Sequence, residues 1–455
     1  MEAAAVRSLV QRSIAAGDVG AARVFCDELL ASSPSDPRSM HCDAVLSLIE
    51  GDAAAARGRT AAAQSAIIEA VAKAKACVAA RPAQYRFHMT LGRALQRSGG
   101  KKDAVAAFSN ATRLSPSTAT FHALAAAQGM AKQCAASARS YNRALLEIAP
   151  DSPLEKRVSL HYAHGQALKR SGDRKAAARA FGKALKLDPS HASSAFKLAS
   201  LLAADGDGRV PTARVARAPA SYVARLFDDY ASTFEAHLTT HLQYQTPSEL
   251  AADVALLFPG RRWPRALDLG CGTGLSGAPF KSTVDEMVGI DLSAAMIAQC
   301  REMRGIPATA AGGDGGGKSR RALYSHLFVG DILAAPMLLG ESTAPFDLVL
   351  CCDTLVYIGA LEPVFEMLAA LVSTHAAAEA PPAVFACSCE LLPGSGDNEP
   401  FRLLRTKRFA HRREYVESTA IAHGWSVRSM RESQIRMNKG APIVGLLCVF
   451  SYTCA

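Results

Sequence analysis

The stretch of sequence that most restricts the fold of this chain is LDLGCGTGLSG, residues 267–277. Its apolar start leads into Gly270, Gly272 and Gly274, which predicts a buried strand, a tight turn and then a helix. Glycine accepts positive φ and lets a ligand approach the backbone, and the first turn of a helix offers unpaired N–H groups to negative groups. The pattern indicates a nucleotide site. Gly272, Gly274 and Gly277 also have the spacing of a dinucleotide-binding motif, so an oxidoreductase remains an alternative at this point.

Three more apolar runs follow, and each ends in an acidic residue. MVGID ends at Asp291, SHLFVGD ends at Asp331, and FDLVLCCD ends at Asp353. Open α/β sheets bind ligands at the carboxyl ends of their parallel strands, so we expect these carboxylates to meet at one edge. A carboxylate at Asp291 can accept hydrogen bonds from both hydroxyls of a ribose. The series predicts a doubly wound, Rossmann-like α/β sheet that binds a nucleotide.

Together these motifs resemble those of the class I S-adenosylmethionine-dependent methyltransferases. The residues that carry the resemblance are Asp268, Gly270, Gly272, Gly274, Asp291 and Asp331. It covers residues 221–455 and implies that this half binds S-adenosyl-L-methionine as its cofactor. It also implies that the sheet ends in an antiparallel hairpin, with its turn at Lys439-Gly440. The acidic series after the glycines and the closing hairpin argue against a nicotinamide oxidoreductase.

The resemblance implies which residues contact each part of the cofactor. The glycine turn, with Cys271, would hold the methionine part, and Asp268 would lie near its amino group. Asp291 and Leu292 would contact the ribose.

The adenine would lie beside Asp331 and Ile332. The stretch SYVARLFDDYASTFEAHL, residues 221–238, is amphipathic with helical spacing. Methyltransferases of this type often carry such a helix over the cofactor, and Tyr230 is the aromatic residue expected to close the site.

The first half of the chain contains an internal repeat. FHMTLGRALQRSGGKKDAVAAFSNATRLSP and LHYAHGQALKRSGDRKAAARAFGKALKLDP place Gly92 in register with Gly165, and Phe108 with Phe181. The pattern resembles the tetratricopeptide repeat, in which small residues let two antiparallel helices approach and the phenylalanine fills the gap between them. Weaker copies of the repeat occupy 3–36, the stretch from 37 onward, and 119–151. A closing helix is expected at 192–204. The sequence predicts an α-helical solenoid of about five repeats.

These patterns divide the chain into a tetratricopeptide-repeat domain at 1–204, a linker at 205–220 and a methyltransferase domain at 221–455. The linker has no periodicity and lacks the apolar residues of a packed segment, so we expect a 221–455 fragment to fold alone and bind the cofactor. The whole arrangement resembles the predicted methyltransferases fused to tetratricopeptide repeats.

Charge is divided unevenly along the chain. Residues 1–204 carry 28 Lys+Arg and 15 Asp+Glu, a net charge of +13, whereas 205–455 carry 23 and 26, a net charge of −3. The basic half predicts a protein or peptide partner bound by the repeats, and an acidic partner would complement its charge. A scaffold role for the repeats, with a solvated basic surface, remains open. Basic residues expected on the first helices of the clearest repeats are Arg86, Arg93, Arg97, Lys169 and Arg170.

The composition makes other classes of protein less favoured. No apolar run is long enough to span a membrane, and no cysteine pair has zinc-ligand spacing with a matching second pair. We therefore expect neither a membrane association nor a metal site, and nucleic acid is a disfavoured partner. Scattered free thiols are consistent with a reducing compartment, and we expect the cytoplasm. An organellar transit peptide is the alternative, because the N-terminal stretch contains two arginines.

The sequence does not reveal the methyl acceptor. Asp353 and Tyr357, near the end of the fourth strand, are candidates for a proton-accepting group, and so is His411, which is expected to reach in from the C-terminal segment; each has a structural alternative. The motif Asn-Pro-Pro-Tyr is absent after that strand, where Asp353-Thr354-Leu355-Val356 stands instead. This argues against methylation of an adenine or glutamine nitrogen. A non-catalytic methyltransferase fold that serves as the scaffold of a repeat adaptor is the alternative to an enzyme.

Overall fold

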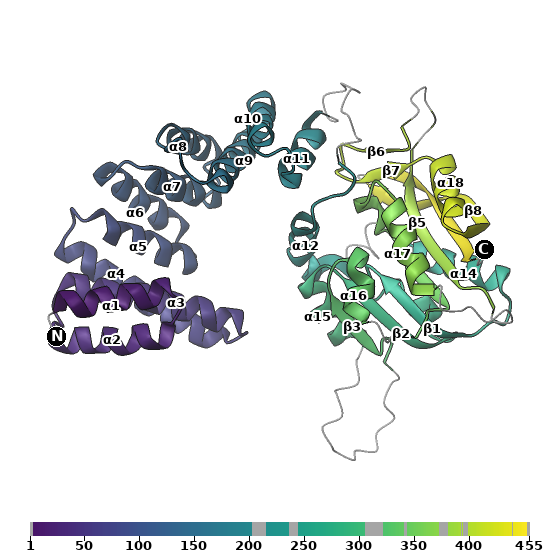
Figure 1. The fold of residues 1–455 in the computed structure, drawn as a ribbon, viewed down its shortest axis with the longest axis horizontal. Helices are drawn as coiled ribbons and strands as arrows, with labels where there is room; N and C mark the ends of the chain where they lie inside the picture. Colours follow the sequence, from purple (N-terminus) through teal and green to yellow (C-terminus); the bar gives the residue numbers. More distant parts are fainter. Residues whose placement is uncertain are drawn as a thin grey trace, which may run out of the picture. The chain divides into compact units, whose positions relative to one another are not determined.

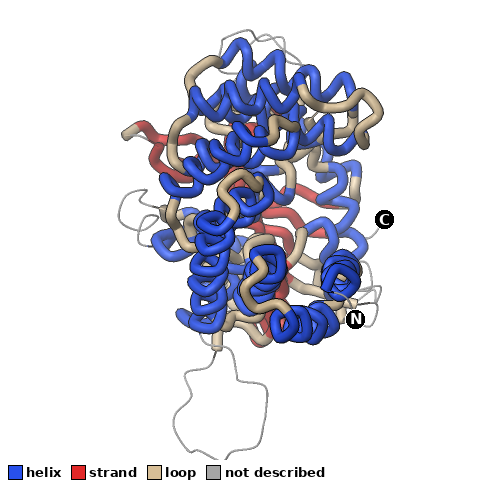
Figure 2. The backbone as a smooth tube through the Cα atoms, turned by 90° about the vertical axis from the view of Figure 1, so that its left-hand side faces the viewer, coloured by secondary structure: helices blue, strands red, loops and turns tan. Residues whose placement is uncertain are grey.

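A computed structural model describes most of the chain: residues 3–202, 215–235, 244–304, 322–340, 344–372, 381–392, 394, 399–438 and 440–452. The chain divides into two compact units, Met1–Ser194 and Ala195–Ala455. We call the first the repeat unit and the second the sheet unit. The strands drawn in Figure 2 all belong to the sheet unit.

The described part of the repeat unit consists of helices joined by short turns (Figure 1). Five successive helix pairs are α1 (Ala3–Ala15) with α2 (Val19–Ser32), α3 (Pro37–Ala56) with α4 (Thr60–Ala80), α5 (Tyr85–Arg97) with α6 (Lys101–Leu114), α7 (Thr118–Met130) with α8 (Cys134–Leu146), and α9 (Leu154–Arg170) with α10 (Arg174–Leu187). A further helix, α11 (Ala192–Leu202), follows them. The predicted solenoid of about five repeats is confirmed, whereas most of α11, which was expected to close it, belongs to the sheet unit.

The glycine and phenylalanine of the two clearest repeats meet inside the pairs α5–α6 and α9–α10. A Cβ added to Gly92 would lie 2.7 Å from the ring of Phe108, and one added to Gly165 would lie 2.7 Å from the ring of Phe181. Both rings are buried. Because there is no room for even a methyl group, the two helices can pack this closely only with glycine at these positions.

The sheet unit is built on parallel strands in the order β3-β2-β1-β4-β5. Their bounds are β1 (Trp263–Leu269), β2 (Val284–Asp291), β3 (His326–Val329), β4 (Leu348–Cys351) and β5 (Val384–Leu391). Beyond β5, β9 (Ala441–Tyr452) pairs antiparallel with β5 and β8 (Trp425–Asn438) pairs antiparallel with β9. Two short strands, β6 (Phe401–Leu403) and β7 (Phe409–His411), also join the sheet, with β7 beside the end of β5. The predicted Rossmann-like sheet with a closing antiparallel hairpin is confirmed, whereas β6 and β7 were not anticipated.

Helices cover both faces of this sheet. On one face lie α14 (Thr246–Leu257) and α15 (Ala294–Arg304), and on the other lie α17 (Glu362–Val372) and α18 (Arg413–Ala422). Successive residues of β4 alternate between the two cores: Leu348 and Leu350 face the first, Val349 and Cys351 the second. Apolar residues at every position of β4 are what a strand buried on both faces requires.

The stretch expected to be a linker differs in part from that expectation. Residues 205–214 lie outside the described part of the chain, but Val215 and Ala218 are buried in the sheet unit. They share an apolar cluster with Phe196 of α11 and with Phe401 and Phe409. The packed part of the sheet unit therefore begins within α11, before residue 221.

Candidate cofactor site

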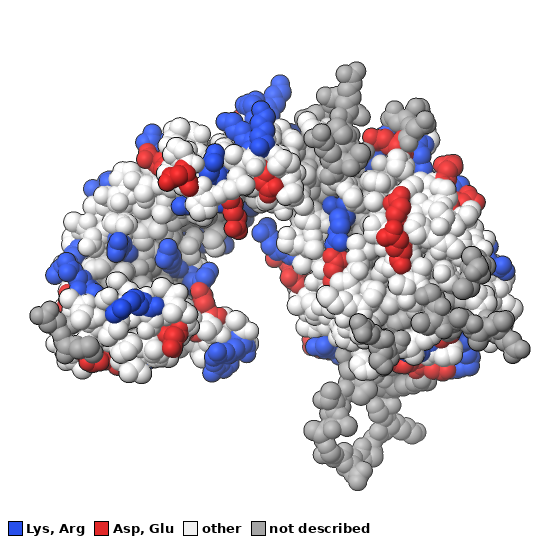
Figure 3. Space-filling model, viewed as in Figure 1, with Lys and Arg blue, Asp and Glu red and all other residues white. Residues whose placement is uncertain are grey.

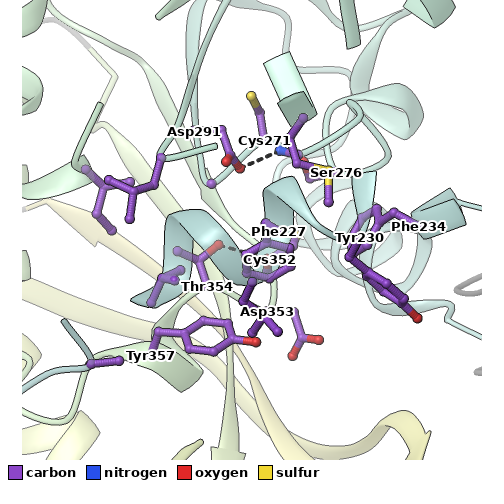
Figure 4. Close-up of a pocket in the computed structure, with 18 of the residues that line it drawn as sticks. Phe227, Tyr230, Phe234, Cys271, Ser276, Asp291, Cys352, Asp353, Thr354 and Tyr357 are labelled. Atoms are coloured by element: carbon purple, nitrogen blue, oxygen red, sulfur yellow. Dashed lines mark hydrogen bonds between the residues drawn. The ribbon is translucent and has the colours of Figure 1, made fainter. Parts of the chain in front are cut away.

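A cavity of about 380 Å³ opens at the carboxyl ends of the parallel strands. Its wall includes the glycine turn after β1, the end of β2, the turn after β3, the turn after β4, and helix α12 (Ala220–Asp228) with the short helix that follows it. Figure 4 shows side chains from these segments around the cavity. The strand ends predicted from the sequence thus converge on one pocket.

The three glycines of the turn all have positive φ, but their surroundings differ. A Cβ on Gly270 would collide with the side chain of Thr354, and a Cβ on Gly274 would lie 3.0 Å from Tyr324. At Gly272 the nearest atom would be in the ring of Phe234, 3.6 Å away. Gly270, Cys271 and Gly272 line the cavity, whereas Gly274 is a packing glycine beneath it. Gly272 is therefore the position at which a ligand can touch the backbone.

Asp291 connects the end of β2 to this turn. One carboxylate oxygen accepts from the Gly272 N–H at 2.9 Å, and the other accepts from the Ser293 N–H at 2.8 Å. Burial raises the pKa of Asp291 above its usual value, and the two backbone donors oppose that shift. Each oxygen keeps one more lone pair to accept from a hydroxyl group, so the carboxylate fits a ribose. Leu292 lies beside it in the cavity wall.

Asp268 lies beneath the cavity rather than in its wall. Its Oδ2 accepts from the Ser276 hydroxyl at 2.6 Å and from the Tyr324 hydroxyl at 2.7 Å, while its buried Oδ1 has no partner among the described residues. Burial raises the pKa of Asp268 to about 6. Ser276 lines the cavity above it. Any contact of Asp268 with a ligand amino group would have to run through Oδ1 or through Ser276.

Asp331 and Ile332 line the far end of the cavity. The Oδ1 atom of Asp331 accepts from the Leu333 N–H at 3.1 Å, and its Oδ2 forms an ion pair with the guanidinium of Arg217. The sequence had placed Arg217 in the linker and gave no sign of this contact.

Aromatic side chains of α12 and the following turn cover the cavity (Figure 4). The ring of Phe234 makes edge-to-face contacts with Phe227 and Tyr230, both at centroid distances of 5.8 Å, and Phe227 also meets Tyr357 at 5.6 Å. Tyr230 was anticipated here. Phe227 and Phe234 belong to the same amphipathic stretch, so its helical spacing had already indicated that they lie on the same side as Tyr230.

Asp353 and Tyr357 line the cavity after β4, beside two arginines that sequence reasoning missed. Arg436 of β8 is 1% exposed; it donates to Asp353 Oδ1 at 2.6 Å and pairs with Glu390 of β5. Arg408 also lines the cavity. Asp353 has a φ of 54°, a strained value for a residue with a side chain. The Arg436 contact holds this carboxylate in one orientation at the cavity.

His411, the third catalytic candidate, does not reach the cavity. It is fully buried on β7, and its Nε2 lies 2.9 Å from the Ile358 carbonyl oxygen and 3.1 Å from that of Gly359. Its ring stacks on Tyr415. The structure corrects the expectation for His411: strand pairing of β7 with β5 turns this side chain inward, where it supports the loop after β4.

The described part of the chain offers neither a metal site nor a membrane span. Within it no group of three or more His, Cys, Asp or Glu side chains is arranged to hold a metal ion. The cysteines described are free thiols. None of the helices described combines the length and apolarity needed to cross a bilayer.

Comparisons with known proteins agree with both units. Residues 266–315 match a family model described as a methyltransferase domain, and residues 89–153 and 162–221 match one described as a tetratricopeptide repeat. No curated protein shows a significant match.

Solved structures resemble one unit or the other. A 1,6-didemethyltoxoflavin-N1-methyltransferase from Burkholderia thailandensis is 18% identical, over 52% of this chain and 91% of that one, with a TM-score of 0.36. The magnesium protoporphyrin IX methyltransferase of Synechocystis PCC 6803 is 14% identical, over 55% and 90%, with a TM-score of 0.30. A tetratricopeptide-repeat protein of Thermus thermophilus is 19% identical, over 44% and 98%, with a TM-score of 0.32. The two family-model matches indicate that the chain joins tetratricopeptide repeats to a methyltransferase domain, whose sheet is Rossmann-like.

Proposed function

We propose that this protein is an S-adenosylmethionine-dependent methyltransferase. The observation that carries the proposal is the pairing of Asp291 with the Gly272 N–H at the open position of the glycine turn. It places a carboxylate suited to a ribose next to backbone that a ligand can touch. The matching methyltransferase-domain model supports the same assignment.

In this proposal the backbone at Gly272 holds the methionine part, Asp291 the ribose, and Asp331 with Ile332 the adenine. The cofactor, when bound, supplies an electrophilic methyl group on a sulfonium. The rings of Phe227, Tyr230 and Phe234 would exclude water from it, and their faces attract a positive charge.

The acceptor would lie near Asp353 and Tyr357. Arg436 orients Asp353, so this carboxylate has a fixed position at the cavity, and Arg408 lies in the wall of the same cavity. Asp353 is the residue we assign to accept a proton from an acceptor that is protonated at neutral pH. An acceptor that is already deprotonated would need only alignment with the methyl group.

Titration calorimetry on the full chain tests the proposal. S-adenosylmethionine and S-adenosylhomocysteine should bind, and NAD should not. Binding of NAD alone would point to an oxidoreductase, and binding of none of the three would leave the domain as a scaffold for the repeats.

For the repeats we propose an acidic peptide partner. A groove of about 440 Å³ is lined by residues of α5, α7 and α9, the first helices of three successive repeats, and it includes Arg93 and Lys156. Arg86 is not among the residues that line this groove; with Arg93 it adds to burial in lowering the pKa of His41 of α3 to about 4. Arg97, in contrast, is paired with Asp52. Lysines and arginines are spread over the face of the repeat unit seen in Figure 3.

Fluorescence anisotropy with an acidic peptide, and with the same peptide carrying Gln for each acid, tests this partner class. Arg93→Gln and Lys156→Gln should each weaken binding of the acidic peptide several-fold at about 50 mM salt, because each removes a charge-assisted contact. The exposed Arg113, on the second helix of its repeat, provides the control Arg113→Gln. Equal affinity for both peptides would refute the acidic partner.

The free thiols are consistent with the cytoplasm as the proposed compartment.

A further inference from the structure

The segment just before α12 pairs with the loop after β4 through an isolated β-bridge. The Ala218 N–H donates to the Tyr357 carbonyl at 2.8 Å, and the Ala216 carbonyl accepts from the N–H groups of Gly359 and Ala360 at 2.7 and 2.9 Å. An antiparallel bridge pairs Arg217 with Ile358. Three backbone hydrogen bonds over so few residues fix the position of the Arg217 backbone.

This bridge brings the Arg217 side chain to the cavity, where it pairs with Asp331. The two side chains are 35% and 28% exposed, so the pair is partly shielded from water. The Leu333 N–H holds the other carboxylate oxygen. Asp331 is therefore held at both oxygens, in a position that the turn after β3 alone would not fix.

An ionised carboxylate can accept about four hydrogen bonds, and these contacts use two of them. Asp331 keeps capacity for a donor in the cavity, and an adenine offers its exocyclic amino group at that edge. We infer that Arg217 is a positioning residue for the nucleobase: it fixes Asp331 so that the carboxylate selects an adenine by its amino group. This inference rests on the proposed function.

The same segment also leads directly into the helix that covers the cavity. Pro219 is the N-cap of α12, and Leu226 and Phe227 of that helix line the cavity. Because Arg217 and the cover are carried by one continuous segment, a bound nucleoside should stabilise the pairing of residues 216–218 with the loop after β4. Binding of the nucleoside should therefore slow hydrogen exchange in this pairing.

The test compares full-length Arg217→Ala and Arg217→Lys with Arg225→Ala, which removes an exposed arginine of α12. Affinities are measured by calorimetry for S-adenosylhomocysteine and for its inosine counterpart, in which a carbonyl replaces the amino group. The wild type should prefer the adenine form. Arg217→Ala should weaken binding of the adenine form about tenfold, and it should change the affinity for the inosine form much less. Arg217→Lys should lie between, because it keeps the charge without the planar guanidinium.

Hydrogen exchange gives a second readout. In the wild type, S-adenosylhomocysteine should slow exchange at Ala218, Gly359 and Ala360, and it should do so less in Arg217→Ala. Wild-type affinity in Arg217→Ala, or an equal loss for both ligands, would overturn the inference while the proposed function stands. A wild type that binds neither ligand would overturn the proposed function, and the inference with it.

Discussion

At the scale of single residues, the cavity separates residues that can touch a ligand from residues that support them. Asp291 and Gly272 line the cavity, whereas Asp268 lies beneath it and His411 is buried behind the loop after β4. The sequence placed all four near one another but could not rank them. Distance from the cavity surface depends on how the side chains of different strands pack.

Asp291→Ala should weaken binding of S-adenosylhomocysteine at least tenfold. The change removes charge-assisted hydrogen bonds to the ribose, each worth about 1.5–3 kcal/mol, and calorimetry measures the loss. Asp285→Ala, at the exposed start of the same strand, is the matched control and should bind as the wild type does. Unchanged affinity in Asp291→Ala would remove this carboxylate from the site.

Gly272→Val should abolish cofactor binding, because its side chain would fill the space where the ligand meets the backbone. It also forces a β-branched residue to a φ of 53°, which costs on the order of 1–2 kcal/mol. Gly260→Val imposes similar strain at a φ of 71° with no neighbour within 4 Å, away from the cavity, and should bind normally. Calorimetry separates a blocked ligand from a strained turn by comparing the two variants.

The pKa of Asp268 predicts how the stability of the sheet unit depends on pH. Its pKa is about 6 in the folded chain, against 3.8 when exposed, because burial disfavours the charged form. The folded state therefore holds the proton more tightly, and the free energy of unfolding should fall as the pH rises from about 4 to above 6, by about 3 kcal/mol at most. Asp268→Asn should remove this part of the dependence. Urea unfolding followed by tryptophan fluorescence measures it, because Trp263 and Trp425 both lie in the sheet unit; identical pH profiles for the two proteins would contradict it.

At the scale of elements, the boundary of the sheet unit depends on contacts between distant parts of the chain. Phe196 of α11 and Val215 pack with Phe401 and Phe409 of the short strands β6 and β7. Those two strands were not predicted, so the apolar surface that receives α11 was not predicted either. A stretch that is irregular in sequence can be packed if another element offers it a surface.

A fragment 192–455 should therefore fold and bind the cofactor as the full chain does, whereas 221–455 should be less stable. The shorter fragment exposes the apolar surface that Phe196 and Val215 cover, and each buried side chain of this size contributes about 1.5–3 kcal/mol. Urea unfolding by tryptophan fluorescence compares the two. Equal stability would show that the apolar cluster adds nothing and that the shorter boundary suffices.

At the scale of the whole molecule, the chain combines two architectures that the sequence signals in different ways. The repeats are recognised from local periodicity, because the spacing of Gly92 and Phe108 within one helix pair recurs in another. The sheet is read from apolar runs that end in Asp291, Asp331 and Asp353. Both signals are short-range, and both gave the correct fold.

The sequence by itself determined the solenoid, the Rossmann-like sheet and the glycine turn, because each depends on the spacing of residues within one or two neighbouring elements. Only the tertiary structure decided that Arg217 meets Asp331, that Arg436 fixes Asp353, and that His411 turns away from the cavity. Arg217 and Asp331 are 114 positions apart, and Arg436 and Asp353 are 83 apart. No local pattern encodes such pairs, because they form only once the strand order and the inward or outward direction of each strand have been set.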